Sequence, residues 1–420
     1  MRFNDAFDAA IRLLQQQPIA NVGEVVLVRD LFGRLRTVVE KRDEPKGKAL
    51  KLWDDQFQQA LGSYFGGPSM VGSEMVAPEQ VFESSDVYSV GGVRVLERGI
   101  TGAEWTRGTV PNRPPSPPRA TFYGMKGGVG RSTALSAWAR HLAGLGHKVL
   151  VVDLDLESPG ISTTLLPNGS AADFGVVDWF VEDAHGNADE DLVRRLAVRS
   201  PLSDQIRSDN VPGEILVAPC GAAEDVHYIA KLARCYLELP GQPRRPFGER
   251  IGLLIDALEA VHKPDVVLLD SRAGLHDIAG IATARLGAMT FLFGTGSRQT
   301  WAGYRTLLRT LARSPENAEE VRGKLKVVAA LVPPELRPQY LTRVREGAYD
   351  AFEPLYDSEG TFNFDVTSED APHFPIPAYS YEEFRDWDPL SATVTDEQIA
   401  AAFGVFVTTA TKLLMGQNRP

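Results

Sequence analysis

A glycine-rich segment between an apolar run and a helix-forming run constrains the fold of this 420-residue chain more than any other feature. Residues 120–123 are mostly apolar and suit a buried strand, and residues 134–145 suit a helix. Glycines between two such elements let backbone N–H groups turn toward an anion, and the helix N-terminus adds partial positive charge at the same point. The sequence therefore predicts a strand, a phosphate-binding loop and a helix in succession.

The side chains of this loop, residues 126–133, predict Mg²⁺–nucleotide binding. Ser132 is placed to offer a hydroxyl to a Mg²⁺ ion bound with the phosphates, and Thr133 a hydroxyl to the α-phosphate. Arg131 stands where such a loop normally carries a lysine, and a planar guanidinium grips phosphate differently from a compact ammonium. We therefore expect binding to survive and hydrolysis to be slow. The residues expected to hold the nucleotide are Gly127, Gly128, Val129, Gly130, Arg131, Ser132 and Thr133.

Two further apolar runs end in aspartates. Residues 149–152 precede Asp153 and Asp155, and residues 266–269 precede Asp270. Apolar runs of this kind are typical of strands buried on both faces, and open α/β sheets bind ligands at the carboxyl ends of such strands. Carboxylates there can hold Mg²⁺ through water or orient an attacking water. We predict Asp153 and Asp270 at the metal, with the alternative that one aspartate of the first pair only caps the next turn.

Arg272 follows Asp270 in a loop expected near the γ-phosphate, and Gly274 gives that loop freedom to move. An arginine there can sense or stabilise the γ-phosphate, as an arginine finger does. The alternative is a surface arginine that pairs with Asp277 or with another acid. The sequence leaves both open.

Residues 126–133, 153–155 and 266–270 resemble the deviant Walker A, Walker A′ and Walker B motifs of the ParA/MinD-like P-loop ATPases, in the branch whose loop reads Lys-Gly-Gly-Val-Gly-Arg. The resemblance implies an α/β fold: a largely parallel sheet flanked by helices on both faces. It also implies ATP and Mg²⁺ as cofactors, Lys126 reaching the partner's nucleotide across an ATP-sandwich homodimer, and Asp155 beside the attacking water. The residues expected to act in hydrolysis are Lys126, Asp155, Arg131 and Arg272.

One part of the resemblance is incomplete. The apolar run at 325–332 lacks the asparagine that relatives often carry there for the base, so adenine is implied by the resemblance alone. Pro377 and the loop to Tyr381 resemble the place where this family encloses the base.

The resemblance covers roughly residues 119–416, which predicts three parts of the chain. Residues 1–107 alternate between helix-like (3–17, 51–65) and strand-like (25–39, 89–96) patterns without a chemical motif. We interpret them as a small α+β interaction or regulatory domain for an unidentified protein partner. The proline-rich residues 108–118 suit an extended linker.

Charge limits the classes of partner. A net charge of −11 argues against nucleic-acid binding over the whole surface. Between Arg298 and Arg345, however, ten Lys/Arg face four Asp/Glu, a local charge of +6. ParA-like relatives often bind DNA without sequence preference in this half, so DNA or RNA contact is one interpretation. A solvated face, or a surface for an acidic protein, is the other.

The remaining composition predicts a cytoplasmic protein with no membrane association. Only two cysteines, Cys220 and Cys235, are present, too few for a metal site and expected to be reduced. We find no secretory signal and no run of about 20 apolar residues. A capping box at Thr395–Gln398 opens a final helix whose apolar stripe we expect to dock on the core, since it lacks the basic face of a membrane-binding helix.

Three functions remain open. The first is a nucleotide-switched dimeric ATPase that regulates or positions a partner. The second is a non-hydrolysing nucleotide-binding scaffold of a larger complex, such as a defence assembly. The third is an ATP-dependent protein that binds DNA without sequence preference.

Overall fold

The computed structural model describes residues 1–19, 21–42, 48–84, 86–99, 117–167, 172–206, 213–222, 225–237, 245–312, 318, 321–357, 362–391 and 393–416. The chain divides into two compact units, which are described separately. The first is essentially Met1–Thr109, and the second combines Val110–Arg309 with Glu319–Pro420. Most of the predicted linker lies outside the described residues, and the three-part division of the chain stays a prediction.

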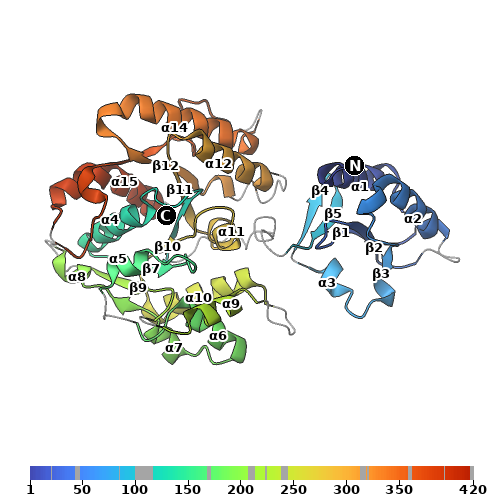
Figure 1. Ribbon diagram of the computed structural model, residues 1–420, viewed down its shortest axis with the longest axis horizontal. Helices are drawn as coiled ribbons and strands as arrows, with labels where there is room; N and C mark the ends of the chain where they lie inside the picture. Colours follow the sequence, from blue (N-terminus) through green and yellow to red (C-terminus); the bar gives the residue numbers. More distant parts are fainter. Residues whose placement is uncertain are drawn as a thin grey trace. The chain divides into compact units, whose positions relative to one another are not determined.

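The first unit is a five-stranded mixed sheet with helices, as its α+β pattern predicted. The strand order is β3-β2-β1-β5-β4, with β1 antiparallel to β2 and parallel to β5 (Figure 1). Its elements are α1 (Phe3–Gln16), β1 (Val25–Arg29), β2 (Leu35–Val39), α2 (Lys48–Leu61), η1 (Gly62–Tyr64), β3 (Met70–Val71), η2 (Gly72–Glu74), α3 (Glu79–Phe82), β4 (Val87–Val90) and β5 (Val93–Glu97).

The strand-like stretch 25–39 is in fact a hairpin of two strands. Its turn forms because Oδ1 of Asp30 accepts hydrogen bonds from the backbone N–H groups of Phe32 and Arg34, both at 2.9 Å. Gly33 supplies the left-handed conformation that the turn needs, with φ of 79°.

The second unit confirms the predicted fold class: an eight-stranded, largely parallel sheet with helices on both faces (Figure 1). The strand order is β13-β12-β11-β6-β10-β7-β9-β8, and only β8 runs antiparallel to its neighbour. Its strands are β6 (Arg119–Gly124), β7 (Lys148–Asp153), β8 (Val198–Arg199), β9 (Glu214–Ala218), β10 (Val266–Asp270), β11 (Met289–Gly294), β12 (Leu325–Val332) and β13 (Ile376–Tyr379).

The helices of the second unit pack on the sheet through two apolar clusters, one on each face. The longer helices are α4 (Arg131–Gly144), α6 (Val176–His185), α9 (Tyr228–Cys235), α10 (Phe247–His262), α11 (Asp277–Ala284), α12 (Arg298–Leu311), α14 (Arg337–Phe352) and α15 (Asp396–Gly416). Shorter ones are α5 (Ile161–Leu165), α7 (Glu190–Arg195), α8 (Leu202–Gln205), η4 (Pro334–Leu336), η5 (Glu353–Leu355) and η6 (Glu382–Phe384).

The final helix docks on the core, as its apolar stripe predicted. Phe406 packs among Phe122, Trp138 and Phe291 with ring centroids 5.7–6.0 Å apart, and Nε1 of Trp138 donates to Thr411 at 2.9 Å. Within the described residues α15 is the one helix long and apolar enough, by length and composition alone, to cross a membrane, a test that core helices also pass. The helix is not an unbroken apolar run, because Thr408, Thr409, Thr411 and Lys412 interrupt it, and the expectation that the chain has no transmembrane helix stays a prediction.

Candidate functional site

The predicted strand, loop and helix are present as β6, residues 125–130 and α4. Gly128 and Gly130 have φ of 70° and 76°, a left-handed conformation that favours glycine. A Cβ added at Gly127 or Gly128 would meet nothing within 4 Å, so the space above the loop is open. The loop can therefore present its backbone N–H groups to an anion beside the N-terminus of α4.

The sheet brings the predicted carboxylates to the foot of this loop. β10 lies between β6 and β7, and its last residue, Asp270, is in register with Phe122 on one side and Asp153 on the other. The hydroxyl of Ser132 donates a hydrogen bond to Oδ2 of Asp270 at 2.7 Å. Parallel pairing therefore places the third motif, which lies more than 100 residues further along the sequence, beside the first two.

Two buried carboxylate oxygens at this site have no hydrogen-bond partner among the described residues: Oδ1 of Asp155 and Oδ1 of Asp270. Burial raises the pKa of Asp270 to about 7, although the Arg131 guanidinium opposes the change. Burial also raises the pKa of the Asp155 carboxyl, again against Arg131. Unpartnered acceptor oxygens in a buried site fit a cation or a polarised water, which would supply the missing interactions.

Asp153 is already engaged in the protein. Its Oδ2 accepts from the backbone N–H and the hydroxyl of Ser162, at 3.1 and 2.6 Å, and its Oδ1 accepts from the N–H of Asp155 at 3.1 Å. Burial raises the pKa of the Asp153 carboxyl. These contacts favour the capping alternative for Asp153. No group of three or more His, Cys, Asp or Glu suited to a metal occurs in the described part of the chain. Ser132 and Asp270 suit Mg²⁺, which takes few protein ligands beside phosphate and water.

Arg131 points into the site and contacts the residue that follows β10 and the loop that follows β7. Its Nη1 donates to the carbonyl of Ser271, and its Nη2 lies 3.6 Å from Oδ2 of Asp155. The side chain of Arg131 is only 9 % exposed. The guanidinium is therefore held next to the carboxylate that the resemblance assigns to the attacking water.

Arg272 pairs with another acid, one of the two alternatives left open. Its partner is Glu157, in the loop after β7, and not Asp277. The hydroxyl of Tyr236 also donates to Glu157, and Nε2 of His276 lies 3.6 Å from the same carboxylate. The γ-phosphate role of Arg272 stays a prediction that would require this ion pair to exchange. Glu157 belongs to no recognised motif, so sequence reasoning missed it.

Lys126 contacts its own subunit: its Nζ donates to Oε1 of Gln299 at the start of α12. Its action across a dimer stays a prediction. Thr133 lines a hollow of about 640 Å³ together with Gly128, Val129 and Gly130. This volume lies within the roughly 300–1,000 Å³ of small-molecule sites.

The far wall of the hollow is formed by the end of β12, the end of β13 with the segment that follows it, and one residue of α15. Leu331 has φ of 53° at an irregularity in the β12–β13 pairing and lines the hollow, together with Ala378 to Glu382, Phe384, Arg385 and Phe403. Pro377 is buried within β13, paired with Ala329, so the following residues, and not Pro377, line the hollow. Neither Leu331 nor Phe403 has a sequence signal for this role, because each reads as an ordinary apolar residue.

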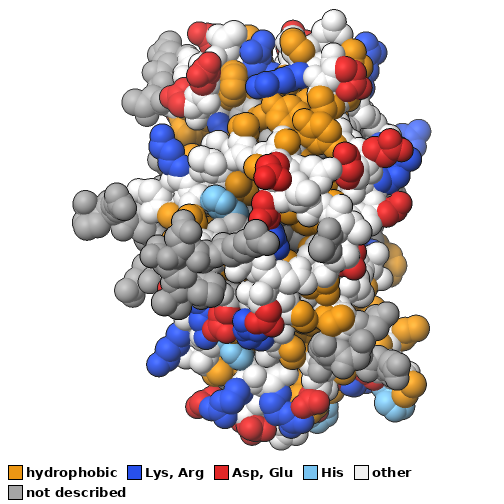
Figure 2. Space-filling view, turned by 90° about the vertical axis from the view of Figure 1, so that its left-hand side faces the viewer, with side chains coloured by type: hydrophobic (Ala, Val, Ile, Leu, Met, Phe, Trp, Pro, Cys, Tyr) orange, Lys and Arg blue, Asp and Glu red, His pale blue; other side chains and the backbone are white. Residues whose placement is uncertain are grey.

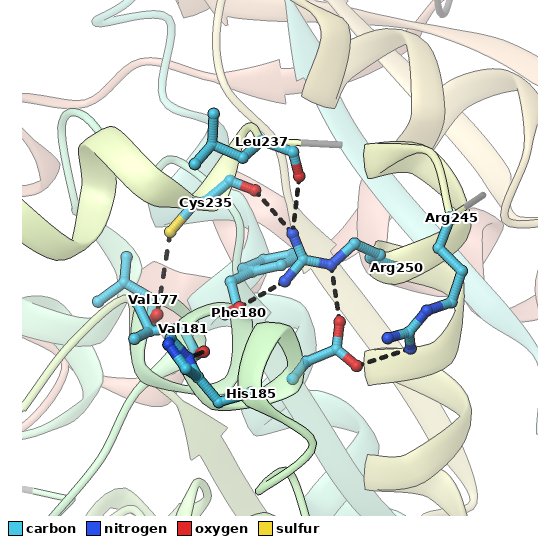
Figure 3. A network of polar contacts seen from close by, with 9 residues as sticks. Val177, Phe180, Val181, His185, Cys235, Leu237, Arg245 and Arg250 are labelled. Atoms are coloured by element: carbon cyan, nitrogen blue, oxygen red, sulfur yellow. Dashed lines mark hydrogen bonds and ion pairs between the residues drawn. The ribbon is translucent and has the colours of Figure 1, made fainter. Parts of the chain in front are cut away.

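Three helices beside the site are held by one buried arginine. Arg250 of α10 donates to Oδ2 of Asp183 on α6 at 2.7 Å and to the carbonyl of Cys235 at the end of α9 at 3.2 Å (Figure 3). Just after α9, Tyr236 reaches Glu157. This network therefore fixes the position of helices that contact the loop after β7.

The basic stretch from Arg298 to Arg345 is not uniformly available to nucleic acid. Lys326 is buried, donates to the carbonyl of Ala371 at 2.7 Å, and has its pKa lowered by burial to about 8. Arg305 pairs with Asp350, and Arg322 pairs with Asp357. On the face drawn in Figure 2, basic side chains lie interspersed with acidic ones. Nucleic-acid contact stays a prediction.

Comparison with known proteins shows a likeness to ParA- and MinD-type structures. A structure of pNOB8 ParA bound to nonspecific DNA is 15% identical, with a TM-score of 0.42, over 71% of this chain and 98% of that chain. MinD from Pyrococcus horikoshii OT3 complexed with Mg-ADP is 15% identical, with a TM-score of 0.42, over 72% and 99%. A Cyanothece McdA variant in complex with ATP is 11% identical, with a TM-score of 0.45, over 72% and 98%.

No family model and no curated protein matches the chain. At identities of 11–15% and TM-scores of 0.42–0.45 these structural likenesses carry no argument about function. The fold class rests on the order and the parallel direction of the strands.

Proposed function

We propose that this protein is a Mg²⁺–ATP-binding switch that dimerises on ATP and is reset by slow hydrolysis. The observation that carries the proposal is the 2.7 Å hydrogen bond between Ser132 of the glycine-rich loop and Asp270, beside two buried carboxylate oxygens without partners in the described residues. Ser132 and Asp270 would hold Mg²⁺, which supplies charge neutralisation on the phosphates when bound.

The other residues of the site divide the work between binding and reaction. The N–H groups of Gly127 to Gly130 surround the phosphates, and Thr133 offers its hydroxyl to the α-phosphate. Asp155 orients the attacking water, because its unpartnered Oδ1 can accept a hydrogen bond that the water donates. Lys126 leaves Gln299 to reach the nucleotide of a second subunit, and Arg272 leaves Glu157 to reach the γ-phosphate.

A non-hydrolysing scaffold is the second candidate, and one contact favours it. Nη2 of Arg131 lies 3.6 Å from Asp155, so the permanent cation competes for the carboxylate that would orient the water. In this reading nucleotide stabilises the dimer and never turns over. Both candidates share nucleotide binding at the loop and differ only in the use of Asp155.

Phosphate release from Mg²⁺–ATP by the full-length protein separates them. We expect slow turnover that Asp155→Asn abolishes while nucleotide binding is kept, because the isosteric amide cannot orient the water as a carboxylate does. Asp265→Asn, at an aspartate more than half exposed before β10, is the matched control and should leave the rate unchanged. Saturable ATP binding without turnover would support the non-hydrolysing scaffold and refute the hydrolysing switch. The absence of nucleotide binding would refute both candidate functions.

Two further measurements test the finer parts of the proposal. Lys126→Ala should lower the mass of the ATP-bound species by light scattering and spare ATP binding. An unchanged mass would refute the action across the dimer. Binding of random-sequence DNA that weakens steeply with salt would support the DNA-binding alternative, and its absence at low salt, with and without ATP, would exclude it.

A further inference from the structure

The sheet of the first unit has two faces, and only one is covered by long helices. α1 and α2 pack on the face that carries Leu27 and Val95. Because successive side chains of a strand point to opposite faces, Val28, Val38 and Leu96 lie on the other face.

The cover on this second face is short. α3 has four residues and is therefore about 6 Å long. Because neighbouring strands lie about 4.8 Å apart, a helix of that length covers little more than the spacing of two strands. α3 contributes Val81 to a small cluster with Val26, Val38 and Leu96. Beside that cluster remains a cavity of about 340 Å³, within the roughly 300–1,000 Å³ of small-molecule sites.

The walls of this cavity combine an apolar floor with a cationic rim. Val28, Val38 and Leu96 form the sheet side, and Met75 and Val81 lie opposite. The charged residues that line it are Asp30, Arg34, Arg36 and Arg98. Three arginines against one aspartate give the rim a formal charge of +2.

Arg36 is a rim cation without a carboxylate partner among the described residues. The single aspartate, Asp30, is taken by Arg34, whose Nε donates to its Oδ2 at 2.8 Å. Arg36 is half-buried and donates through Nη2 to the carbonyl of Gly66, which carries no net charge. Its Nε is buried and has no hydrogen-bond partner among the described residues, and none of their carboxylates forms an ion pair with it. Burying a donor and a charge in this way is unfavourable unless an anion joins them.

We propose that this cavity binds a small amphiphilic anion: an apolar body of about a dozen non-hydrogen atoms that carries one carboxylate or sulfonate. The anionic group pairs with Arg36 and supplies its Nε with an acceptor. The apolar body covers Val28, Val38 and Leu96. The first unit is then a ligand-sensing domain, a property independent of the nucleotide site.

The test uses the full-length protein and the fluorescent probe anilinonaphthalene sulfonate, displaced by decanoate or by uncharged decanol. In the wild type, decanoate should displace the probe at about ten-fold lower concentration than decanol, because only decanoate pairs with Arg36. Arg36→Gln should remove that ten-fold difference. Val28→Trp, which fills the cavity, should remove displacement of the probe by either compound.

Arg42→Gln is the matched control, because Arg42 belongs to the same unit, is half exposed and pairs with Glu74 at 2.9 Å outside the cavity. It should behave as the wild type. Equal displacement by decanoate and decanol in the wild type would overturn the proposal, and so would wild-type behaviour of folded Arg36→Gln or Val28→Trp. If only an acidic peptide with apolar side chains binds with the same dependence on Arg36, the occupant is a protein segment and the proposal fails. Circular dichroism reports folding, and Arg36→Met, which also removes the charge, replaces Arg36→Gln if the latter does not fold.

Discussion

Replacing Arg250 by methionine is expected to lower the free energy of unfolding of the second unit by about 4 kcal/mol. Arg250 is fully buried, at 0 % exposure, and its Nε donates to Asp183 at 2.7 Å. Its terminal nitrogens donate to three main-chain carbonyls, those of Phe180, Cys235 and Leu237 (Figure 3).

The magnitude follows from what the substitution leaves behind. Methionine fills much of the same volume but donates nothing, so three carbonyls lose a donor. Asp183, 7 % exposed, keeps only Arg245, whose Nη1 lies 2.8 Å from its Oδ1 and whose side chain is 34 % exposed. Removing one partner of a buried ion pair typically costs about 3–5 kcal/mol because the remaining charge is uncompensated.

Urea unfolding checks this value, and two further variants isolate its cause. Arg250→Met should lower the midpoint by about 1 M or more. Arg245→Met, which removes the more exposed partner of the same carboxylate, should cost about 1 kcal/mol or less. Adding Asp183→Leu to Arg250→Met should recover at least about 1 kcal/mol, because no charge is then stranded. A midpoint for Arg250→Met no lower than that of Arg245→Met would refute the reasoning.

Three other predictions concern the nucleotide site and the sheet. Glu157→Gln should tighten ATP binding about five-fold and leave ADP binding unchanged, because it frees Arg272 for the γ-phosphate; equal effects on both nucleotides in fluorescence titrations would contradict this. Arg131→Lys should keep ATP binding and raise the rate of phosphate release by roughly 2- to 10-fold, and loss of binding would show that the arginine contacts are required. Lys326→Met should stabilise the protein at pH 7, because the buried ammonium, whose pKa falls from 10.5 to about 8, is unfavourable. That difference corresponds to at most about 3 kcal/mol, less the hydrogen bond to Ala371. Between about pH 8 and 10.5 the folded protein binds fewer protons than the unfolded chain, so the stability of the wild type rises with pH in this range. The stability gained by Lys326→Met should therefore be smaller at pH 10 than at pH 7. An equal gain at the two pH values would contradict the prediction.

Much of the fold could be predicted because its signals are local. The buried strands that end at Asp153 and Asp270 are continuous apolar runs, and such runs are typical of parallel strands covered on both faces. The capping box of the last helix was also correct: Thr395 and Gln398 exchange hydrogen bonds at 2.9 and 3.3 Å. By contrast β3 and β8 have two residues each, too few for a periodic pattern, and their pairing depends on neighbouring strands.

The site divides in the same way. Glycines at 128 and 130 predicted the loop, and both adopt the left-handed φ that favours glycine. The residue types of Ser132 and Asp270 predicted the metal and phosphate chemistry of the site. The lining of the hollow by Leu331 could not be predicted, since its φ of 53° arises from an irregularity between two strands and from no preference of leucine.

By itself the sequence determined that the chain folds as a largely parallel α/β sheet with a phosphate-binding loop, because glycine spacing and apolar runs act over a few residues. Tertiary structure alone decided which charges meet. It placed Arg131 beside Asp155 and Arg272 on Glu157, and it left Arg36 beside an apolar cavity. The physical reason is that ion pairs and cavities depend on residues far apart in the chain, and only the packing of strands and helices sets the distances between them.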